Sequence, residues 1–260
     1  VHRYTQRCDP QGDGACCAAF YQRPDVQYLL GDSYHPGGTE LTHGLAEGLE
    51  LSDGARLLDV ACGIGTSLDA IRARWPIEAV GIDMQPPDPR EGLTFHRGDV
   101  HQIPLPDASF DAVLCECALS TFADQPRALS EMLRVLKPGG RLALSDMVLK
   151  GAMPADLVDW IHLGTCLSHA RALPDYAALL TSAGFEVVAV DDAAWALQRL
   201  TERIKRKLVG LALATASGMA PEGVNIDIKQ ARDVLRHAEA AITAGVVSYG
   251  TLVARKPEIP

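Results

Sequence analysis

The sequence predicts an α/β protein whose core is a doubly wound, mostly parallel β-sheet. Two observations carry this expectation. Short apolar runs alternate with helix-like segments along much of the chain, and a glycine-rich turn directly follows the first of these runs. Because parallel strands need long crossover connections, which are usually helical, this alternation implies helices on both faces of the sheet.

Each expected element follows from its local pattern of apolar and polar residues. Strands are expected at 56–60, 79–82, 94–97, 110–115, 141–146, 185–190 and 246–254. Helices are expected at 39–49, 66–74, 125–136 and 174–183, and over most of 193–243 with a break near 218–223. The Lys-Pro-Gly-Gly sequence at 137–140 indicates a helix stop and a tight turn into the fifth strand.

Composition narrows the class of protein. The chain has 260 residues, a net charge of −9, 47% hydrophobic residues and 22% charged residues, which is ordinary for a globular protein with a large core. The acidic balance argues against a general nucleic-acid binder, which needs a basic face. No apolar run reaches membrane-spanning length and no signal peptide is visible, so we expect a cytoplasmic protein, not bound to membranes, whose seven cysteines are reduced.

The segment 57–65, Leu-Leu-Asp-Val-Ala-Cys-Gly-Ile-Gly, carries the strongest functional signal. Glycine has no side chain, so a strand that ends in such a turn lets a small cofactor lie close to the backbone. A second apolar run ends in Asp83, 18 residues after Gly65, and a carboxylate at that place can hold both hydroxyls of a ribose. A third acid, Asp99, follows the next run.

Two familiar nucleotide-binding patterns fit this segment poorly. A dinucleotide fingerprint needs a third glycine where this chain has Leu68. A phosphate-binding loop needs a lysine in the turn, whereas the first lysine of the chain is Lys137. A nicotinamide-dependent oxidoreductase is therefore disfavoured.

The pattern Asp59-x-x-x-Gly63-x-Gly65, together with Leu-Lys-Pro-Gly-Gly at 136–140, resembles the class I S-adenosylmethionine-dependent methyltransferases over about residues 51–190. The resemblance implies a seven-stranded Rossmann-like sheet, a helical insertion before the last strand, and antiparallel pairing of that strand with the strand at 185–190. It also implies S-adenosylmethionine as the cofactor.

The resemblance also assigns roles to particular residues. Asp59, Ala61 and Gly63 would lie at the methionine end of the cofactor, and Gly65 would allow close approach of the backbone. Asp83 would take the ribose hydroxyls. The remaining cofactor-binding candidates are Met84, packed on the adenine, Asp99 and Val100 at its edge and face, and Glu116 as a base or a ligand to the amino group.

The acceptor is suggested by cysteines. Cys115 and Cys117 favour apolar packing, but Cys16 and Cys17 form a vicinal pair in a polar segment, and thiolates suit soft, thiophilic centres. With Val1-x-x-Tyr4, Ala-Cys-Cys at 15–17, Leu-Gly at 30–31 and Leu-Gly-Thr-Cys-Leu at 163–167, the chain resembles the arsenite methyltransferases over about residues 1–190.

That resemblance implies that Cys16 or Cys17 and Cys166 hold a trivalent arsenic, whose lone pair attacks the sulfonium methyl. It also leads us to expect a thiol reductant as a partner. The family commonly has another cysteine where this chain has Asp32, and a further one near Gly184, which this chain lacks. A methylated trivalent arsenical or another soft metalloid is therefore a better expected substrate than inorganic arsenite.

Other functions stay open from the sequence. An enzyme of the same fold that methylates oxygen, nitrogen or carbon of an organic small molecule is the main alternative, with Tyr28, Tyr34 and His35 as lid or base candidates. A non-enzymatic metalloid sensor is more remote, because four ligands at structural-zinc spacing are absent from the sequence. We expect residues 1–50 to form a cysteine-bearing cap and residues 51–260 to form the methyltransferase domain.

Overall fold

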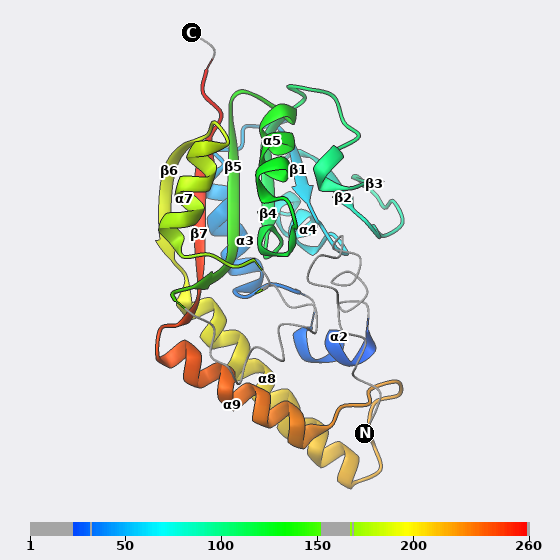
Figure 1. Cartoon of the computed structure of the whole chain (residues 1–260). Coiled ribbons are helices and arrows are strands. Elements are labelled where there is room, and N and C mark those ends of the chain that lie inside the picture. The colour runs from blue at the N-terminus through cyan, green and yellow to red at the C-terminus, as the bar shows by residue number, and fades with distance from the viewer. Residues whose placement is uncertain (1–22, 32, 152–166, 168, 259–260) are drawn as a thin grey trace.

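The protein is seen in a computed structural model that describes residues 23–31, 33–151, 167 and 169–258. A seven-stranded sheet with the order β3-β2-β1-β4-β5-β7-β6 forms its centre (Figure 1). The strands are β1 (Arg56–Val60), β2 (Glu78–Asp83), β3 (Leu93–Arg97), β4 (Phe110–Glu116), β5 (Leu136–Leu149), β6 (Glu186–Asp192) and β7 (Val247–Arg255).

The pairing of the strands confirms the predicted fold class. β1 pairs in parallel with β2 and β4, β3 pairs in parallel with β2, and β5 pairs in parallel with β4. β7 lies between β5 and β6 and is antiparallel to both, as expected for the last strand. The strand order reverses between β1 and β4, and in such sheets ligands bind beyond the carboxyl ends of the strands at this switch point.

Helices cover both faces of the sheet and enclose two hydrophobic cores. On one face, α5 (Gln125–Val135) and α7 (Leu173–Ser182) contribute buried Leu129, Met132 and Tyr176 to one core. On the other face, α3 (Gly38–Gly48) and α4 (Thr66–Arg72) contribute Leu45 and Leu68 to the second. Neighbouring residues of the strands alternate between these cores, which is the pattern that a sheet buried on both faces requires.

The predicted helical insertion before the last strand is confirmed. It consists of α8 (Ala194–Ala216) and α9 (Ile228–Thr243), which pack together and reach beyond one end of the sheet (Figure 1). The break between them contains the glycines that predicted it. A short helix that the sequence did not predict, α2 (Pro24–Leu30), contacts α8. Within the described residues, no helix is both long enough and apolar enough to cross a membrane.

The Lys-Pro-Gly-Gly segment differs from its prediction. α5 does end at Val135, but the segment at 137–140 lies inside β5 instead of forming a separate turn before it. The pairing with β4 passes from Phe110–Leu136 to Ala112–Arg141, so the extra residues bulge out of the ladder, and Gly139 takes a φ of 77° there. Proline and glycine thus interrupt the pairing without ending the strand.

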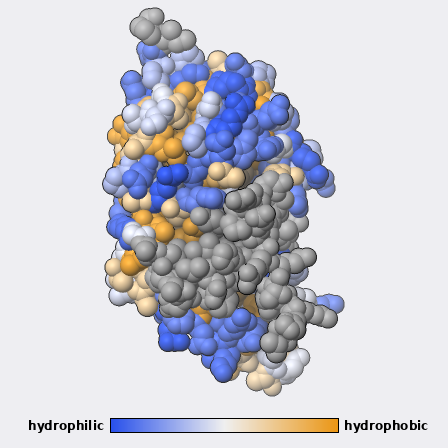
Figure 2. Space-filling view, in the orientation of Figure 1, coloured by the Kyte–Doolittle hydropathy of each residue, from blue (hydrophilic) through white to orange (hydrophobic). Residues whose placement is uncertain are grey.

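The surface reflects the same layering. Figure 2 shows a hydrophilic surface over α5, which turns its apolar face to the sheet, and a more hydrophobic surface over α7 and β6. β6 is an edge strand, and its Val188 and Val190 are 53% and 40% exposed.

Candidate active site

A pocket lies where the fold predicts a ligand, at the carboxyl ends of β1, β2 and β4. Its walls come from the turn after β1, the residues after β2 and β3, and the end of β4. The predicted cofactor-binding residues that line it are Asp59, Ala61, Gly63, Asp83, Met84, Asp99, Val100 and Glu116. The structure therefore brings together side chains that are up to 57 positions apart in the sequence.

The pocket is acidic. Four carboxyl groups line it, those of Asp59, Asp83, Asp99 and Glu116, and the described lining residues include no lysine or arginine. Histidines 35 and 101 are the basic side chains among these lining residues. Such a lining favours a cationic ligand and disfavours a phosphate, whose charge would need basic partners.

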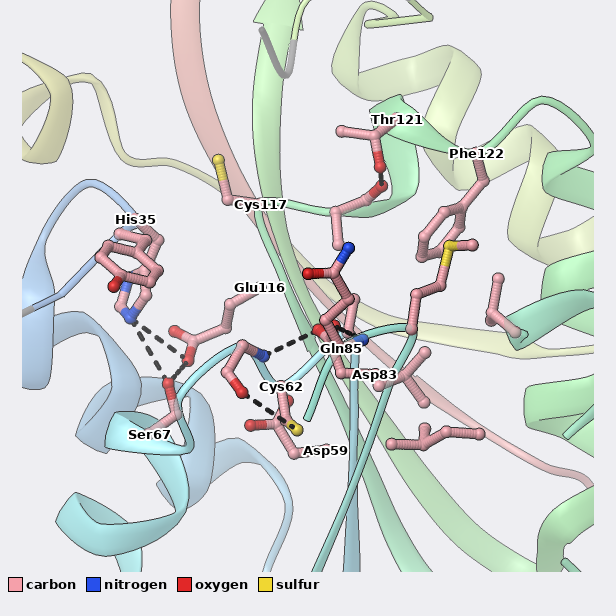
Figure 3. Close-up of a pocket in the computed structure, with 18 of the residues that line it drawn as sticks. His35, Asp59, Cys62, Ser67, Asp83, Gln85, Glu116, Cys117, Thr121 and Phe122 are labelled. Atoms are coloured by element: carbon pink, nitrogen blue, oxygen red, sulfur yellow. Dashed lines mark hydrogen bonds and ion pairs between the residues drawn. The ribbon is translucent and has the colours of Figure 1, made fainter. Parts of the chain in front are cut away.

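The turn after β1 is held by the acid at the end of β2 (Figure 3). The Gly63 N–H donates to Asp83 Oδ2 at 2.9 Å, and the Gln85 N–H donates to Asp83 Oδ1 at 2.8 Å. Ala61 and Gly63 have positive φ values of 58° and 53°. A non-glycine residue in this region is strained, and such residues gather at functional sites.

The structure gives a reason for Gly65 beside the expected one. A Cβ atom at this position would lie 2.7 Å from Phe95 Cζ, and its φ of 80° begins α4 in a left-handed conformation. The packing of Phe95 and the backbone conformation therefore both require glycine here. The close approach of a cofactor to the Gly65 backbone stays a prediction. At Gly63, by contrast, a Cβ atom would meet the ring of Tyr34 only at 3.7 Å.

Asp59 is buried beneath the turn, with 3% of its surface exposed. Burial raises the pKa of its carboxyl well above the ordinary value, and the negative charges of Glu116 and Asp83 raise it further. A cationic group in the pocket would oppose this shift, because it favours the ionised carboxyl.

The residues after β3 form the side of the pocket predicted for an adenine. Val100 is buried, and Asp99 accepts the backbone N–H of His101 at 2.9 Å and contacts His101 Nδ1 at 2.7 Å. Burial acts to raise the pKa of Asp99, but these bonds and the charge of His101 lower it below its ordinary value. The buried Nε2 of His101 has no hydrogen-bond partner within the described part of the chain.

Glu116 lies at the centre of a buried cluster (Figure 3). The Ser67 hydroxyl donates to Glu116 Oε2 at 2.6 Å, and the Thr42 hydroxyl lies 3.1 Å and 3.2 Å from the two carboxylate oxygens. His35 Nε2 lies 3.5 Å from Oε2. The carboxylate thus lines the pocket while polar groups from three other segments hold it in place.

The sequence missed two members of this cluster. Thr42 and Ser67 are isolated hydroxyl residues on helical segments, and nothing in their local pattern marks them. His35 was named as a lid or base candidate, but nothing in the sequence indicates its contact with Glu116. The structure connects all three because α3 and α4 both reach the end of β4.

The two cysteines near Glu116 differ. Cys115 is fully buried in a hydrophobic core, as expected, and burial raises the pKa of its thiol. Cys117 packs against the other hydrophobic core, as expected, and it is also partly exposed in the pocket wall. Its φ of 53° makes it the counterpart of Ala61 at the neighbouring strand end.

The cysteines assigned to a metalloid, Cys16, Cys17 and Cys166, lie outside the described residues. The residue after Cys166, Leu167, is described and packs against a hydrophobic core. The His169 N–H donates to the Ser120 carbonyl at 2.9 Å, in the turn that follows Cys117. Among the described residues, no group of three or more His, Cys, Asp or Glu side chains is placed to hold a metal ion.

Comparison with known proteins defines the class of the domain. Residues 58–144 match a family described as a methyltransferase domain. These residues contain the turn after β1 and the ends of β2 and β4. The match places a methyltransferase domain within the chain, and the seven-stranded sheet agrees with it.

Three relatives named as methyltransferases are similar to this chain, and two of them are named for different acceptors. The chain is 30% identical to methyltransferase GfsG of Streptomyces halstedii over 62% of this chain and 63% of that protein. It is 27% identical to an arsenite methyltransferase of Halobacterium salinarum over 70% of this chain and 52% of that protein. It is 28% identical to 27-O-demethylrifamycin SV methyltransferase of Amycolatopsis mediterranei over 85% of this chain and 84% of that protein. The chain thus spans only about half to two-thirds of the first two relatives.

Solved structures confirm the fold across nearly the whole chain. The [4+2]-cyclase SpnF has a TM-score of 0.73 at 22% identity and covers 96% of this chain and 97% of its own. The cyclopropane synthase MmaA2 of Mycobacterium tuberculosis has a TM-score of 0.76 at 15% identity. This match covers 96% of the present chain and 100% of the chain of MmaA2. At these identities the likeness extends to the fold and not to the reaction.

Proposed function

We propose that the protein transfers a methyl group from S-adenosylmethionine to a small-molecule acceptor. The observation that carries the proposal is the acidic pocket at the switch point of the sheet, whose described lining contains four carboxyl groups and no lysine or arginine. This cofactor is a sulfonium cation with an ammonium group, so its charge suits the pocket. The buried, unpartnered Nε2 of His101 is a second sign that a ligand belongs there.

The residues of the chain would divide the work of binding. S-adenosylmethionine supplies an electrophilic methyl group on a sulfonium. Asp83, already fixed by two backbone N–H groups, would hold the ribose hydroxyls, and Met84 and Val100 would flank the adenine. Asp59, Gly63 and Glu116 would surround the amino-acid end. Holding donor and acceptor in line while excluding water is the main task of such a site.

For the acceptor, we favour an organic small molecule. The wall after β4 is formed by Ala118, Thr121, Phe122 and Ala123, which is mostly apolar. The relative matched over more than four-fifths of both chains carries the name of a rifamycin methyltransferase, which supports an organic acceptor. Apolar walls with a few polar groups are typical of sites for organic ligands.

A thiolate-bound trivalent arsenical or related soft metalloid is the second candidate. It is supported by the likeness to an arsenite methyltransferase, by Cys16, Cys17 and Cys166, and by the thiol of Cys117 in the pocket wall. In this case a thiol reductant would keep the metalloid trivalent and the cysteines reduced.

One assay tests both acceptors. The protein is incubated with S-adenosylmethionine and a thiol reductant, and separately with arsenite, methylarsenite and a panel of phenols, hydroxyquinones and macrolides. S-adenosylhomocysteine formation and methylated products are measured by mass spectrometry. Methylation of an organic compound supports the first candidate, and methylated arsenic supports the second. No acceptor-dependent S-adenosylhomocysteine formation from a protein that binds the cofactor would contradict the proposed activity and favour a sensor.

The variant Cys166→Ser separates the two candidates further. Loss of arsenic methylation with unchanged cofactor binding would support the thiolate-bound metalloid. Full activity on arsenic would exclude a role for this thiolate.

A further inference from the structure

We propose that His35 is a positioning residue of the cofactor site. It fastens the segment before α3 to the end of β4 and thereby holds Tyr34 over the glycine turn. The proposal rests on the proposed function, because it gives a role to residues around the site for the methyl donor. Both residues lie outside the matched domain at 58–144, so the family does not assign them this role.

The first observation is the place of the segment. Ser33, Tyr34 and His35 line the pocket although they precede β1 by more than 20 positions. The ring atoms Cδ2 and Cε2 of Tyr34 lie 3.7 and 3.9 Å from where a Cβ atom on Gly63 would be. Tyr34 therefore covers the turn on the side where the backbone carries no side chain, and this segment completes the wall around the turn.

The second observation is the set of partners of the His35 ring. His35 Nδ1 lies 3.1 Å from the Pro36 carbonyl, which can only accept, so Nδ1 carries a hydrogen. His35 Nε2 lies 3.4 Å from the hydroxyls of Thr42 and Ser67 and 3.5 Å from Glu116 Oε2.

The two hydroxyls near His35 Nε2 both have oxygen acceptors of their own. The Ser67 hydroxyl uses its hydrogen in the 2.6 Å bond to Glu116, and the Thr42 hydroxyl has carboxylate oxygens and the Gly38 carbonyl as acceptors. Nε2 thus lies among the side-chain oxygens of Thr42, Ser67 and Glu116, and these contacts tie the ring to the end of β4.

These contacts connect four segments of the chain around Glu116. His35 is 8% exposed and Glu116 is 9% exposed, so water competes little for the polar contacts between them. The cluster joins the segment at 33–36, α3 through Thr42, α4 through Ser67, and β4 through Glu116. Removing one member of a buried polar cluster leaves its partners without a hydrogen bond, so the connection depends strongly on each member.

The same geometry shows why His35 positions and does not catalyse. Both ring nitrogens are engaged by protein groups, so neither is available to remove a proton from an acceptor. The neighbour that faces the turn is Tyr34. Figure 3 shows the imidazole directed at Ser67 and Glu116, away from Phe122 on the opposite side of the pocket.

The test compares variants of His35 by titration calorimetry with S-adenosylhomocysteine. In His35→Asn the amide can replace only the donor at Nδ1, so we expect affinity to fall at least about tenfold. In His35→Gln the amide can replace the polar group at Nε2, and we expect recovery of a large part of that loss. His43→Asn is the matched control, because His43 lies on the neighbouring helix α3 and bonds the Ala70 carbonyl at 3.1 Å but does not line the pocket.

A double-mutant cycle of Tyr34 and His35 tests whether His35 acts on the cofactor site through Tyr34. A general loss of stability would not couple the two substitutions. Tyr34→Leu should weaken S-adenosylhomocysteine binding about fivefold in the wild-type background and less than about twofold in His35→Asn, because the ring is no longer held over the turn. Amide hydrogen exchange without ligand should accelerate at 33–42 in His35→Asn, while β1 keeps its protection.

Several results would overturn the role of His35. These are unchanged affinity in His35→Asn, an equal loss in His43→Asn, or additive effects of the Tyr34 and His35 substitutions. If the wild-type protein itself does not bind S-adenosylhomocysteine, the proposed function fails and this role fails with it. If the wild-type protein binds and His35→Asn binds equally well, only the role of His35 fails.

Discussion

The two walls of the pocket are held in place by different kinds of contact. The wall at the ends of β1 and β2 is fixed by Asp83, which accepts the N–H groups of Gly63 and Gln85. The wall after β4 depends on distant residues. Ser120 bonds Asp146 through its N–H and its hydroxyl, at 2.8 and 2.6 Å, and its carbonyl accepts the N–H of His169.

The two walls therefore differ in where their supports lie. Both walls fall within residues 58–144, but the second is also braced by Asp146 of β5 and by His169, which lie beyond the matched domain. A change in the later part of the chain can therefore reshape the wall after β4 without disturbing the wall assigned to the cofactor. Two relatives that are named for different acceptors are consistent with this division.

The largest expected effect concerns the first wall. Gly65→Ala would place a methyl group 2.7 Å from Phe95 at a φ of 80°, so steric overlap adds to backbone strain. We expect a loss of about 3–5 kcal/mol in the free energy of unfolding, measured by urea denaturation. Gly63→Ala is the matched control and should lose only about 1–2 kcal/mol, because its methyl group meets nothing closer than 3.7 Å. Equal losses would show that Phe95 does not explain the glycine.

The second prediction concerns the brace of the other wall. Burial raises the pKa of Asp146 to about 7, and hydrogen bonds from Ser120 offset the effect only in part. In the unfolded chain an aspartate titrates near pH ~3.9. The protonated carboxyl of Asp146 therefore makes its full contribution to folding stability below pH ~3.9. This contribution is lost as the pH rises through about 7.

Denaturation at several pH values measures this dependence. Between pH ~5 and ~8, the stability of the wild-type protein should fall by about 2–3 kcal/mol relative to Asp146→Asn, which cannot titrate. A stability difference that does not change with pH would show that the carboxyl of Asp146 titrates below this range.

The two walls also differ in how much of each could be predicted from the sequence. The strands, the antiparallel last strand and the acids at the strand ends were predicted, because apolar periodicity and glycine position are local signals. The Glu116 cluster was not, since Thr42 and Ser67 acquire their role only when α3 and α4 meet β4. The packing of Phe95 beside Gly65 was not predicted either, because residues 30 positions apart meet only in the folded sheet.

The third prediction separates binding from folding at the first wall. Asp83→Asn keeps one acceptor oxygen and presents an amide N–H₂ to a backbone donor, either Gly63 N–H or Gln85 N–H. We expect S-adenosylhomocysteine affinity to fall at least about tenfold by titration calorimetry. Glu78→Gln is the control, because it removes an exposed acid at the other end of the same strand. Comparable losses in both variants would exclude a specific role for Asp83.

The smallest predicted effect is on the acceptor wall. Thr121 donates its hydroxyl to the Ala118 carbonyl at 2.6 Å and shapes the turn that lines the pocket. Thr121→Val should raise the KM for the acceptor by about two- to tenfold, as expected for the loss of one hydrogen bond, with unchanged cofactor affinity. Thr121→Ser keeps the hydroxyl and should behave like the wild type. A change in cofactor affinity with no change in acceptor KM would reverse the assignment of the two walls.

The central claim is that the acidic pocket binds a cationic methyl donor, and ligand titration tests it most directly. Calorimetry is carried out with S-adenosylmethionine, and with reduced nicotinamide dinucleotide and adenosine triphosphate as anionic competitors. We expect one S-adenosylmethionine to bind per chain and no measurable binding of either anionic nucleotide, because the four carboxyl groups that line the pocket favour a cation. Binding of a phosphate-bearing nucleotide in place of S-adenosylmethionine would contradict the claim.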